Sequence, residues 1–235
     1  SYSNKSCAKV RTLQGPAWIN ADYATVTAFD DISLAFTIDP SSETDLFRLD
    51  RKIGHAGTFE PIASIRSSIN AISYIDNEGD ITRNNYYRLS AINSCNLPER
   101  TSNVASNILL KSERGSDDNI ILKWNDYYKW NGVVSSYRVY MDTGNGFTQQ
   151  ALLASSDTTH SINISEVMYG ATAGKICFYV FAEEASNPYG TDGESRSNTT
   201  CYNMEETITV PNIFTPNGDL KNDLFAPVFT FTPSE

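Results

Sequence analysis

Short runs of alternating apolar and polar residues cover most of the chain, which is the pattern of half-buried β-strands. The clearest run is Tyr86 to Asn93, in which Tyr87 and Leu89 would face a core while their neighbours face away. Comparable runs span Ile32 to Asp39 and Ile120 to Tyr127, and turn-forming residues separate them. The pattern predicts an all-β chain.

The chain also repeats itself. "SYSNKSC" at Ser1 to Cys7 recurs as "SRSNTTC" at Ser195 to Cys201, with two Ser, the Asn and the Cys in register. Two units between these points share the order strand, strand, hairpin and strand pair, and the polar linker Lys111 to Asn119 separates them. We therefore expect four segments: the end of a preceding repeat (1–8), a first domain (9–111), a second domain (112–206) and the start of a different element (207–235).

About seven short strands per unit of about 100 residues predict an antiparallel β-sandwich. Both units resemble fibronectin type III domains, a pattern shared with other immunoglobulin-like sandwiches. Trp124 stands where that family keeps a core tryptophan on its second strand, and Phe36 occupies the nearest equivalent place in the first unit. Neither unit is expected to keep the family's tyrosine corner clearly, because counting back along the penultimate strand reaches Asn85 and Ile176.

Composition and charge narrow the classes of partner. Tyr and Phe are abundant, at 13 and 11 residues, which favours strands over helices. The net charge is −10, from 18 Lys and Arg against 28 Asp and Glu, and no basic cluster interrupts it. A nucleic-acid partner and an anionic membrane surface are therefore not expected. No apolar run approaches the roughly 18 residues of a membrane-spanning helix.

Four cysteines without a C-x-x-C pair favour disulfides and an oxidising compartment over a metal site. Cys177 and Cys201 would lie at one pole of the second sandwich, where a bridge would add about 3 kcal/mol on the chain-entropy model. Cys7 and Cys95 would share the opposite pole of the first. Alternatively, Cys7 is the counterpart of Cys201 and pairs with a cysteine further upstream, which leaves Cys95 unexplained.

We find no constellation that predicts catalysis. The sequence contains no nucleophile elbow, zinc-protease motif, phosphate loop or dinucleotide fingerprint. His55 and His160 stand beside small polar residues, without ligands at metal spacing, so both are expected in exposed turns or strands. We expect no catalytic residue, no metal site and no enzymatic activity. The acidic residues of linkers and strand ends are expected to be solvated: Asp117, Asp118, Glu183 and Glu184.

An aromatic loop, "NDYYKWNG" from Asn125 to Gly132, allows two interpretations. Tyr127, Tyr128 and Trp130 could stack on sugar rings, which would make the chain an adhesin or a module that binds surface polysaccharide. In a sandwich this loop faces the pole at which the preceding domain joins. Packing at that pole is therefore the expected role.

The stretch Val210 to Phe225, "VPNIFTPNGDLKNDLF", carries the densest turn signals in the chain. Pro216 fixes φ, the Asn217-Gly218 pair supplies positive φ, and the acidic and amide side chains that follow can bond to their own backbone. The sequence predicts a rigid loop between short β segments. Its oxygen-bearing side chains also offer a possible calcium site, without the ligand pattern of an EF-hand: Asn217, Asp219, Asn222 and Asp223.

This stretch resembles the opening of the gliding-motility-associated C-terminal domain of Bacteroidetes surface proteins, the type B sorting signal of the type IX secretion system. The positions that match are Val210, Pro211, Asn212, Phe214, Thr215, Pro216, Asn217, Gly218, Asp219, Asn222, Asp223 and Phe225. Leu220, where the family usually has Gly, and Lys221 depart from the pattern. The family domain is much longer than residues 207–235, so a truncated sorting domain is expected.

The resemblance implies a role. We expect a non-enzymatic stalk and secretion-signal region of a protein that is exported across the outer membrane to the cell surface or the medium. Its partners would be the outer-membrane translocon and the components that receive its substrates. The sorting contacts would come from Phe214, Thr215, Pro216, Asn217, Gly218, Asp219, Asn222, Asp223 and Phe225. An enzyme upstream, with this segment as its stalk, is a further alternative.

Overall fold

The computed structural model describes residues 13–116, 118–168, 174–203, 208–209 and 228–229. Contacts divide the chain into two units. Unit 1 consists of Ser1–Asn107, Tyr127–Val134 and Glu183–Ser195. Unit 2 consists of Ile108–Asp126, Ser135–Ala182 and Arg196–Glu235. Each unit has its own apolar core.

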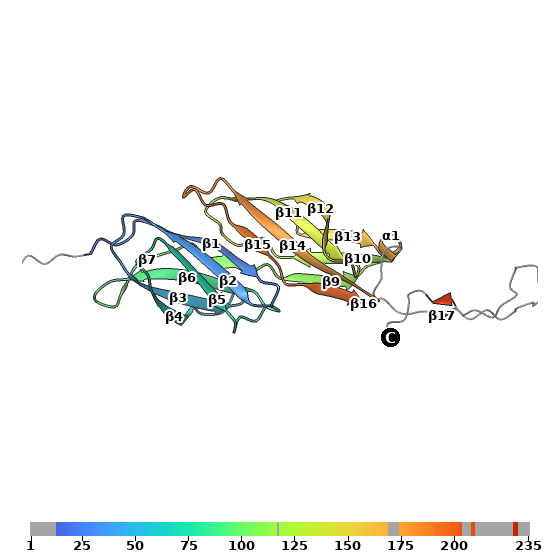
Figure 1. The fold of residues 1–235 in the computed structure, drawn as a ribbon, viewed down its shortest axis with the longest axis horizontal. Coiled ribbons are helices and arrows are strands. Elements are labelled where there is room, and N and C mark those ends of the chain that lie inside the picture. The colour runs from blue at the N-terminus through green and yellow to red at the C-terminus, as the bar shows by residue number, and fades with distance from the viewer. Residues whose placement is uncertain (1–12, 117, 169–173, 204–207, 210–227, 230–235) are drawn as a thin grey trace, which may run out of the picture. The chain divides into compact units, whose positions relative to one another are not determined.

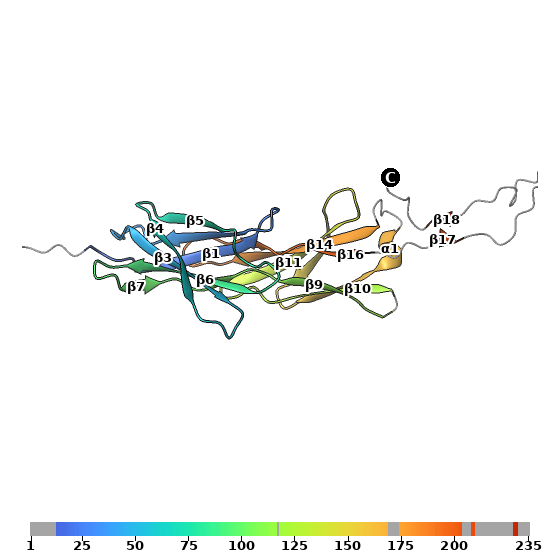
Figure 2. The same cartoon turned by 90° about the horizontal axis from the view of Figure 1, so that it is seen from below.

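Unit 1 is a sandwich of two antiparallel sheets, which Figures 1 and 2 show from two sides. One sheet has the order β1-β2-β5, and the other has the order β4-β3-β6-β7 with β8 also paired to β6. The strands are β1 (Ile19–Val26), β2 (Ile32–Ile38), β3 (Leu46–Ile53), β4 (Glu60–Arg66), β5 (Ala71–Asp76), β6 (Asn85–Ile92), β7 (Pro98–Thr101) and β8 (Ala105–Ser106).

Unit 2 repeats this order with β13-β10-β9 in one sheet and β12-β11-β14-β15 in the other, where β16 also pairs with β14. Some residues of β11, β14 and β15 are counted with unit 1. The elements are β9 (Leu110–Arg114), β10 (Asn119–Trp124), β11 (Val133–Asp142), β12 (Thr148–Ala154), β13 (Thr159–Asn163), α1 (Ile164–Met168), β14 (Lys175–Ala185), β15 (Glu194–Arg196), β16 (Thr200–Asn203), β17 (Ile208–Thr209) and β18 (Val228–Phe229).

This strand order confirms the predicted fold class: the chain is all-β, with tandem fibronectin type III or immunoglobulin-like antiparallel sandwiches. Among the described residues, no helix combines the length and the apolar composition that a membrane span requires.

The alternation predicted from the sequence is seen as alternating burial in β14, whereas in β6 the residues Tyr86 and Ser90, expected to face away from the core, are also buried. In β6, Tyr87, Leu89 and Ala91 are fully buried in the core of unit 1. In β14, every second residue is buried over eleven positions. Trp124 lies on β10, the second strand of unit 2, and packs edge-on against Tyr137 with their ring centroids 5.7 Å apart. The residue at the corresponding place in unit 1, Phe36 on β2, is also fully buried.

A Ser-Asn pair after the penultimate strand joins the two sheets of unit 1. Ser102 exchanges two hydrogen bonds with Leu89 of β6: its N–H donates to the Leu89 carbonyl at 2.9 Å, and its Oγ accepts from the Leu89 N–H at 3.0 Å. The Asn103 amide bonds both backbone groups of Ala21 on β1, in the opposite sheet, at 2.7 and 3.2 Å. One dipeptide therefore connects both layers.

Unit 2 contains the same arrangement, which we call the Ser-Asn clamp. Ser197 pairs with Val180 of β14 at 2.8 and 2.9 Å, and the Asn198 amide bonds the N–H and the carbonyl of Leu110 on β9 at 2.7 and 3.0 Å. The repeat seen in the sequence thus has a structural cause. Its first copy, within Ser1–Cys7, lies outside the described residues.

We predict that Asn198→Ala lowers the free energy of unfolding of unit 2 by about 3 kcal/mol. The substitution removes two hydrogen bonds and leaves the N–H and the carbonyl of Leu110, which is 1% exposed, without those partners. Urea denaturation followed by circular dichroism measures the change. Asn145→Ala, in the exposed hairpin turn after β11, is the matched control and should change stability by less than 0.5 kcal/mol, as is usual for surface substitutions.

The unfolding free energy of unit 1 should depend on pH through Asp39. Its carboxylate accepts hydrogen bonds from the backbone of Ser41 at 2.9 Å and of Ala17 at 2.8 Å, and these bonds lower its pKa below 3.8. Because the folded pKa is lowered, this stabilisation is complete above the unfolded pKa and is lost as pH falls through the folded pKa. Asp39→Asn should therefore flatten the fall in unfolding free energy below about pH 4. Asp30→Asn, on an exposed turn, should leave it unchanged.

Candidate functional site

The predicted sorting contacts, Phe214 to Phe225, lie outside the described residues. Their two flanks are described: β17 pairs with β18 in an antiparallel ladder, with Ile208 opposite Phe229 and Thr209 opposite Val228. The chain on either side of 210–227 therefore meets in a two-residue ladder. The potential calcium ligands Asn217, Asp219, Asn222 and Asp223 belong to the same stretch, so both ideas stay predictions.

The aromatic loop is buried against β1 of unit 1. Tyr127 is 5% exposed, and its hydroxyl accepts a hydrogen bond from the Ala24 N–H at 2.8 Å. Trp130 is 8% exposed, and its Nε1 donates to the Asp22 carbonyl at 2.6 Å. The two rings stack with centroids 3.8 Å apart. The alternative that all three aromatic residues form an exposed ligand platform is therefore wrong for Tyr127 and Trp130. Tyr128 alone is partly exposed.

A β-bulge explains why this surface of β1 can receive the loop. The register between β1 and β2 shifts between Ala21 and Tyr23, which leaves Asp22 as the extra residue. The Asp22 carboxylate accepts hydrogen bonds from Asn20 at 2.6 Å and Thr37 at 2.8 Å. Burial raises the pKa of Asp22, and these hydrogen bonds oppose the rise. At the bulge, the Asp22 carboxylate thus bonds neighbouring side chains, and the Asp22 backbone carbonyl is left to accept from Trp130 Nε1.

Glu184 is the buried acceptor that holds the other side of the loop. It is 5% exposed, and its carboxylate accepts from the Gly132 N–H at 2.7 Å, from the Asn187 side chain at 2.8 Å and from the Gly193 N–H at 2.9 Å. We expected Glu184 to be solvated, so that prediction was wrong. A carboxylate directed at backbone amides is a positioning group, because both oxygens are already occupied.

Glycine is required at Gly132 and Gly193 by close approach. A Cβ at Gly193 would overlap the Asp22 carbonyl, and a Cβ at Gly132 would overlap the carbonyl of Ala185. No local pattern signals either contact, since each depends on chain segments that are distant in sequence.

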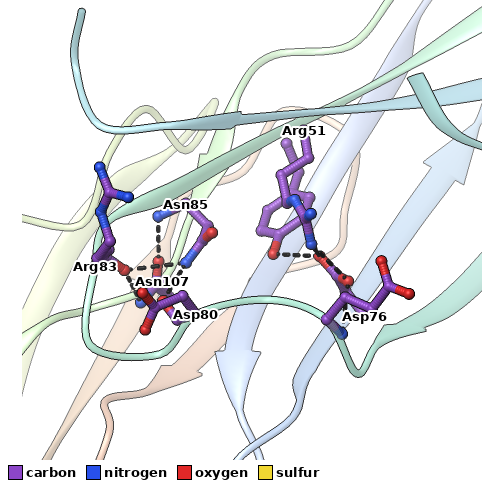
Figure 3. A network of polar contacts seen from close by, with 8 residues as sticks. Arg51, Asp76, Asp80, Arg83, Asn85 and Asn107 are labelled. Atoms are coloured by element: carbon purple, nitrogen blue, oxygen red, sulfur yellow. Dashed lines mark hydrogen bonds and ion pairs between the residues drawn. The ribbon is translucent and has the colours of Figure 1, made fainter. Parts of the chain in front are cut away.

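A second polar network in unit 1 replaces the tyrosine corner. The Tyr87 hydroxyl donates to the Asp76 carboxylate at 2.8 Å, and Arg51 Nη1 bonds the two oxygens of the same carboxylate at 2.9 and 2.8 Å. Figure 3 shows Arg51 directed at Asp76. Burial, and then the Asp76 charge, raises the pKa of Tyr87, so its hydroxyl stays a donor. Counting positions along the strand for a tyrosine corner did not identify Tyr87, because the group that accepts its hydroxyl hydrogen bond is a side chain of β5.

The loop between β5 and β6 is fixed beside this network, as Figure 3 also shows. The Asn85 amide donates to the carbonyls of Asp80 and Arg83 at 2.8 and 3.0 Å. The Asn107 side chain accepts from the Asn85 N–H at 2.7 Å and donates to the Arg83 carbonyl at 3.1 Å. These contacts satisfy backbone groups of the loop, and they position no reacting group.

The predicted Cys177–Cys201 disulfide is confirmed. The two residues are directly opposite in the β14–β16 ladder, with Cα atoms 4.0 Å apart, and the bond links residues 24 positions apart. Cys95 lies in the turn after β6 and carries an exposed free thiol. Its suggested partner Cys7 lies outside the described residues, so the Cys7–Cys95 pairing stays a prediction.

The histidines show no metal site. His55 is exposed in the turn after β3 and lies 2.9 Å from the Tyr86 hydroxyl. His160 is half-buried on β13, and burial lowers its pKa. In the part of the chain that the structure describes, no group of three or more His, Cys, Asp or Glu residues could hold a metal ion.

No protein-family model and no curated protein matches the chain. Solved structures with similarity include the FN1–FN3 domains of chicken CNTN1, at 12% identity over 87% of this chain and 73% of that chain, with a TM-score of 0.31. A two-domain fibronectin type III segment of chicken tenascin aligns at 15% identity over 81% of this chain and 100% of that chain, with a TM-score of 0.28.

Pectate lyase PelI from Erwinia chrysanthemi, in complex with tetragalacturonic acid, aligns at 15% identity and a TM-score of 0.26. The alignment covers 40% of this chain and 27% of that chain, so the chain spans about a quarter of that enzyme's length. At such TM-scores the fold assignment depends on the strand order within each unit.

We predict that Tyr127→Phe lowers the unfolding free energy of unit 1 by about 1–3 kcal/mol, because the fully buried Ala24 N–H loses its acceptor. Thermal and urea denaturation measure the loss. Tyr128→Phe removes a hydroxyl from the adjacent, partly exposed ring and should change stability by less than 0.5 kcal/mol. Equal stability of both variants would show that the Tyr127 hydrogen bond contributes nothing.

Proposed function

We propose that this chain is a structural and targeting region: tandem sandwiches that form a non-enzymatic stalk, followed by a sorting segment for type IX export. The observation that carries the proposal is a sorting-type sequence, Val210 to Phe225, directly after two sandwich units of which the second bears a disulfide. Fibronectin-like domains and a disulfide are consistent with an extracellular or surface protein.

The stalk role is supported by what the distinctive side chains do. The aromatic residues Tyr127 and Trp130 and the carboxylates of Glu184 and Asp76 are each bonded to backbone or to neighbouring side chains of unit 1. Buried polar groups that are fully engaged in this way rigidify a fold and specify one packing. The residues most suggestive of chemistry in the sequence therefore serve the stability of the sandwich.

The targeting role is supported by the resemblance of the segment and by its flanks. Within it, Phe214 and Phe225 would act as apolar anchors, and Asn217 to Asp223 would form the turn that a receiving component recognises. The described residues on either side of this segment pair with each other, Ile208 opposite Phe229 and Thr209 opposite Val228. Its partners would be the outer-membrane translocon and the substrate-receiving components of the type IX system.

The test replaces Phe214 and Phe225 with Ala in the gene, in the cell that makes the protein. We expect the variant to accumulate in the periplasm, with at least a tenfold loss of protein from the cell surface and the medium, measured by fractionation and immunoblotting.

Leu220→Gly is the matched control, because it moves the loop toward the sorting pattern and should leave export unchanged. Normal export of the Phe214→Ala/Phe225→Ala variant would refute the targeting role. Loss of export by Leu220→Gly alone would show that the family pattern does not apply to this loop.

A further inference from the structure

The outward face of β3 and β6 in unit 1 gathers cations. Core residues such as Phe47 and Leu49 alternate with Arg48, Asp50 and Lys52, so these three point away from the core. Residues directly opposite each other in a ladder share a face. In the β3–β6 register, the facing pairs are Arg48 with Ser90, Asp50 with Arg88 and Lys52 with Tyr86. Three cations therefore share one face with one carboxylate.

That carboxylate orients the cations without exposing its own charge. Asp50 is 1% exposed, and it accepts hydrogen bonds from the Nε atoms of Arg48 at 2.8 Å and Arg88 at 3.0 Å. The two arginine side chains stay 35% and 33% exposed. Arg48 bonds Asp50 through Nε and Nη2, and Arg88 bonds it through Nε. One buried carboxylate thus orients both guanidinium groups, and their remaining N–H groups can donate to an incoming carboxylate.

No carboxylate of the neighbouring strand β4 joins Asp50 on this face. Glu60 lies opposite Arg51 in the ladder, and Arg51 turns to Asp76 on the other side of the sheet. The face therefore carries a net positive charge in a chain whose net charge is −10. A local inversion of the sign of the surface charge attracts anionic partners and sets their orientation.

Aromatic rings lie beside these cations: Phe59 and Tyr128 are partly exposed, whereas Tyr86 is buried at 3% exposure. Lys52 Nζ lies 4.7 Å from the ring centroid of Tyr86, and the Arg88 guanidinium lies 4.2 Å from that of Phe59. Tyr86 meets Tyr128 edge-on at 5.4 Å, and Lys129 Nζ lies 5.1 Å from the Tyr128 ring. Cation–π contacts hold these flexible cations in place before a ligand arrives, which lowers the entropy lost on binding.

The geometry suits an extended ligand. Arg48 and Lys52 are four residues apart on one strand, a separation of about 13 Å, and β6 runs about 5 Å to the side. Cations repeated over this distance match charges repeated along a polymer. The partly exposed rings of Phe59 and Tyr128 beside the cations favour a ligand whose apolar C–H faces alternate with its anionic groups, as in a uronic-acid polysaccharide, over a peptide or a nucleic acid.

We propose that this surface, the cationic face formed by Arg48, Lys52, Arg88 and Lys129 with Tyr86, Phe59 and Tyr128, binds an acidic polysaccharide that carries carboxylates along its chain. Guanidinium and ammonium groups bind the carboxylates, and the partly exposed ring of Tyr128 contacts a sugar ring. This function is independent of the sorting segment. It also relocates carbohydrate binding from the buried rings of Tyr127 and Trp130 to a face on which Arg48, Arg88 and Tyr128 are partly exposed.

The test measures binding of the whole chain to alginate, a polyuronate, by isothermal titration calorimetry at low salt, with neutral dextran as the uncharged comparison. Wild type should bind alginate and not dextran, with an affinity that falls as salt rises. Lys52→Gln/Lys129→Gln should weaken binding about tenfold, as expected for two exposed ionic contacts. Neither lysine holds the buried Asp50 carboxylate, so the variant should melt as wild type does.

Lys111→Gln/Lys175→Gln is the matched control, since it removes the same charge from exposed positions of unit 2 and should bind as wild type does. An equal loss in this control, or less than a twofold loss in the Lys52→Gln/Lys129→Gln variant, would overturn the proposal. Tyr128→Ala should weaken alginate binding further. Equal affinity for polyglutamate, with Tyr128→Ala without effect, would assign the face to an acidic peptide and would also overturn it.

Discussion

The Ser-Asn clamp is the interaction on which each sandwich depends. A β-sandwich has two sheets whose backbone hydrogen bonds run within each layer, so apolar packing alone connects the layers unless a side chain crosses between them. That crossing is provided by Ser102-Asn103 in unit 1 and Ser197-Asn198 in unit 2. Each serine pairs with a residue of β6 or β14, and each asparagine bonds both backbone groups of one residue in the opposite sheet. The amide accepts from an N–H with its oxygen and donates to a carbonyl with its nitrogen, which an ionised Asp carboxylate cannot do because it only accepts. The clamp therefore fixes the register between the layers, and the same dipeptide recurs because the same geometric problem recurs.

With the layers fixed, the remaining polar groups of unit 1 become fixed points for its loops. The bulge at Asp22 presents a carbonyl to Trp130, Glu184 collects the backbone amides of Gly132 and Gly193, and Asp76 ties Tyr87 to Arg51. In each case a charged or aromatic side chain satisfies groups that would otherwise be buried without partners, at a cost of about 1–3 kcal/mol each. Tyr127 and Trp130, whose rings suggest ligand binding in the sequence, are used in the structure to pack the loop against β1. The outer face of the β3–β6 sheet differs, because there a single buried carboxylate orients two guanidinium groups and leaves them accessible. In this sheet, Arg51 and Tyr87 bond Asp76 on the core side, whereas Arg48 and Arg88 bond Asp50 on the other side.

Some of this could be predicted from the sequence, for reasons that particular residues make clear. Alternation of period two is a local property, so Tyr87 and Leu89 on β6 and the buried positions of β14 were predictable from neighbouring residues alone. The Cys177–Cys201 bridge followed from the strand order, because the two positions close one pole. Glu184 and the aromatic pair Tyr127 and Trp130 were not predictable. Whether a strand-end carboxylate is solvated, or a loop ring exposed, depends on which distant backbone group arrives beside it, and no local pattern encodes that.

The sequence by itself determined the all-β class, the two repeated units and the position of the disulfide, since these depend on periodicity, internal repetition and strand order. Only the tertiary structure decided the destinations of the side chains: that Asn103 and Asn198 cross between layers, that Tyr87 pairs with a carboxylate of β5, that Trp130 is buried, and that Arg48, Arg88 and Lys52 share the outer face of one sheet. The physical reason is the separation along the chain between the residues that determine each feature. Periodicity comes from backbone geometry within a few residues, whereas burial and hydrogen-bond partners come from contacts between strands that are far apart in the chain.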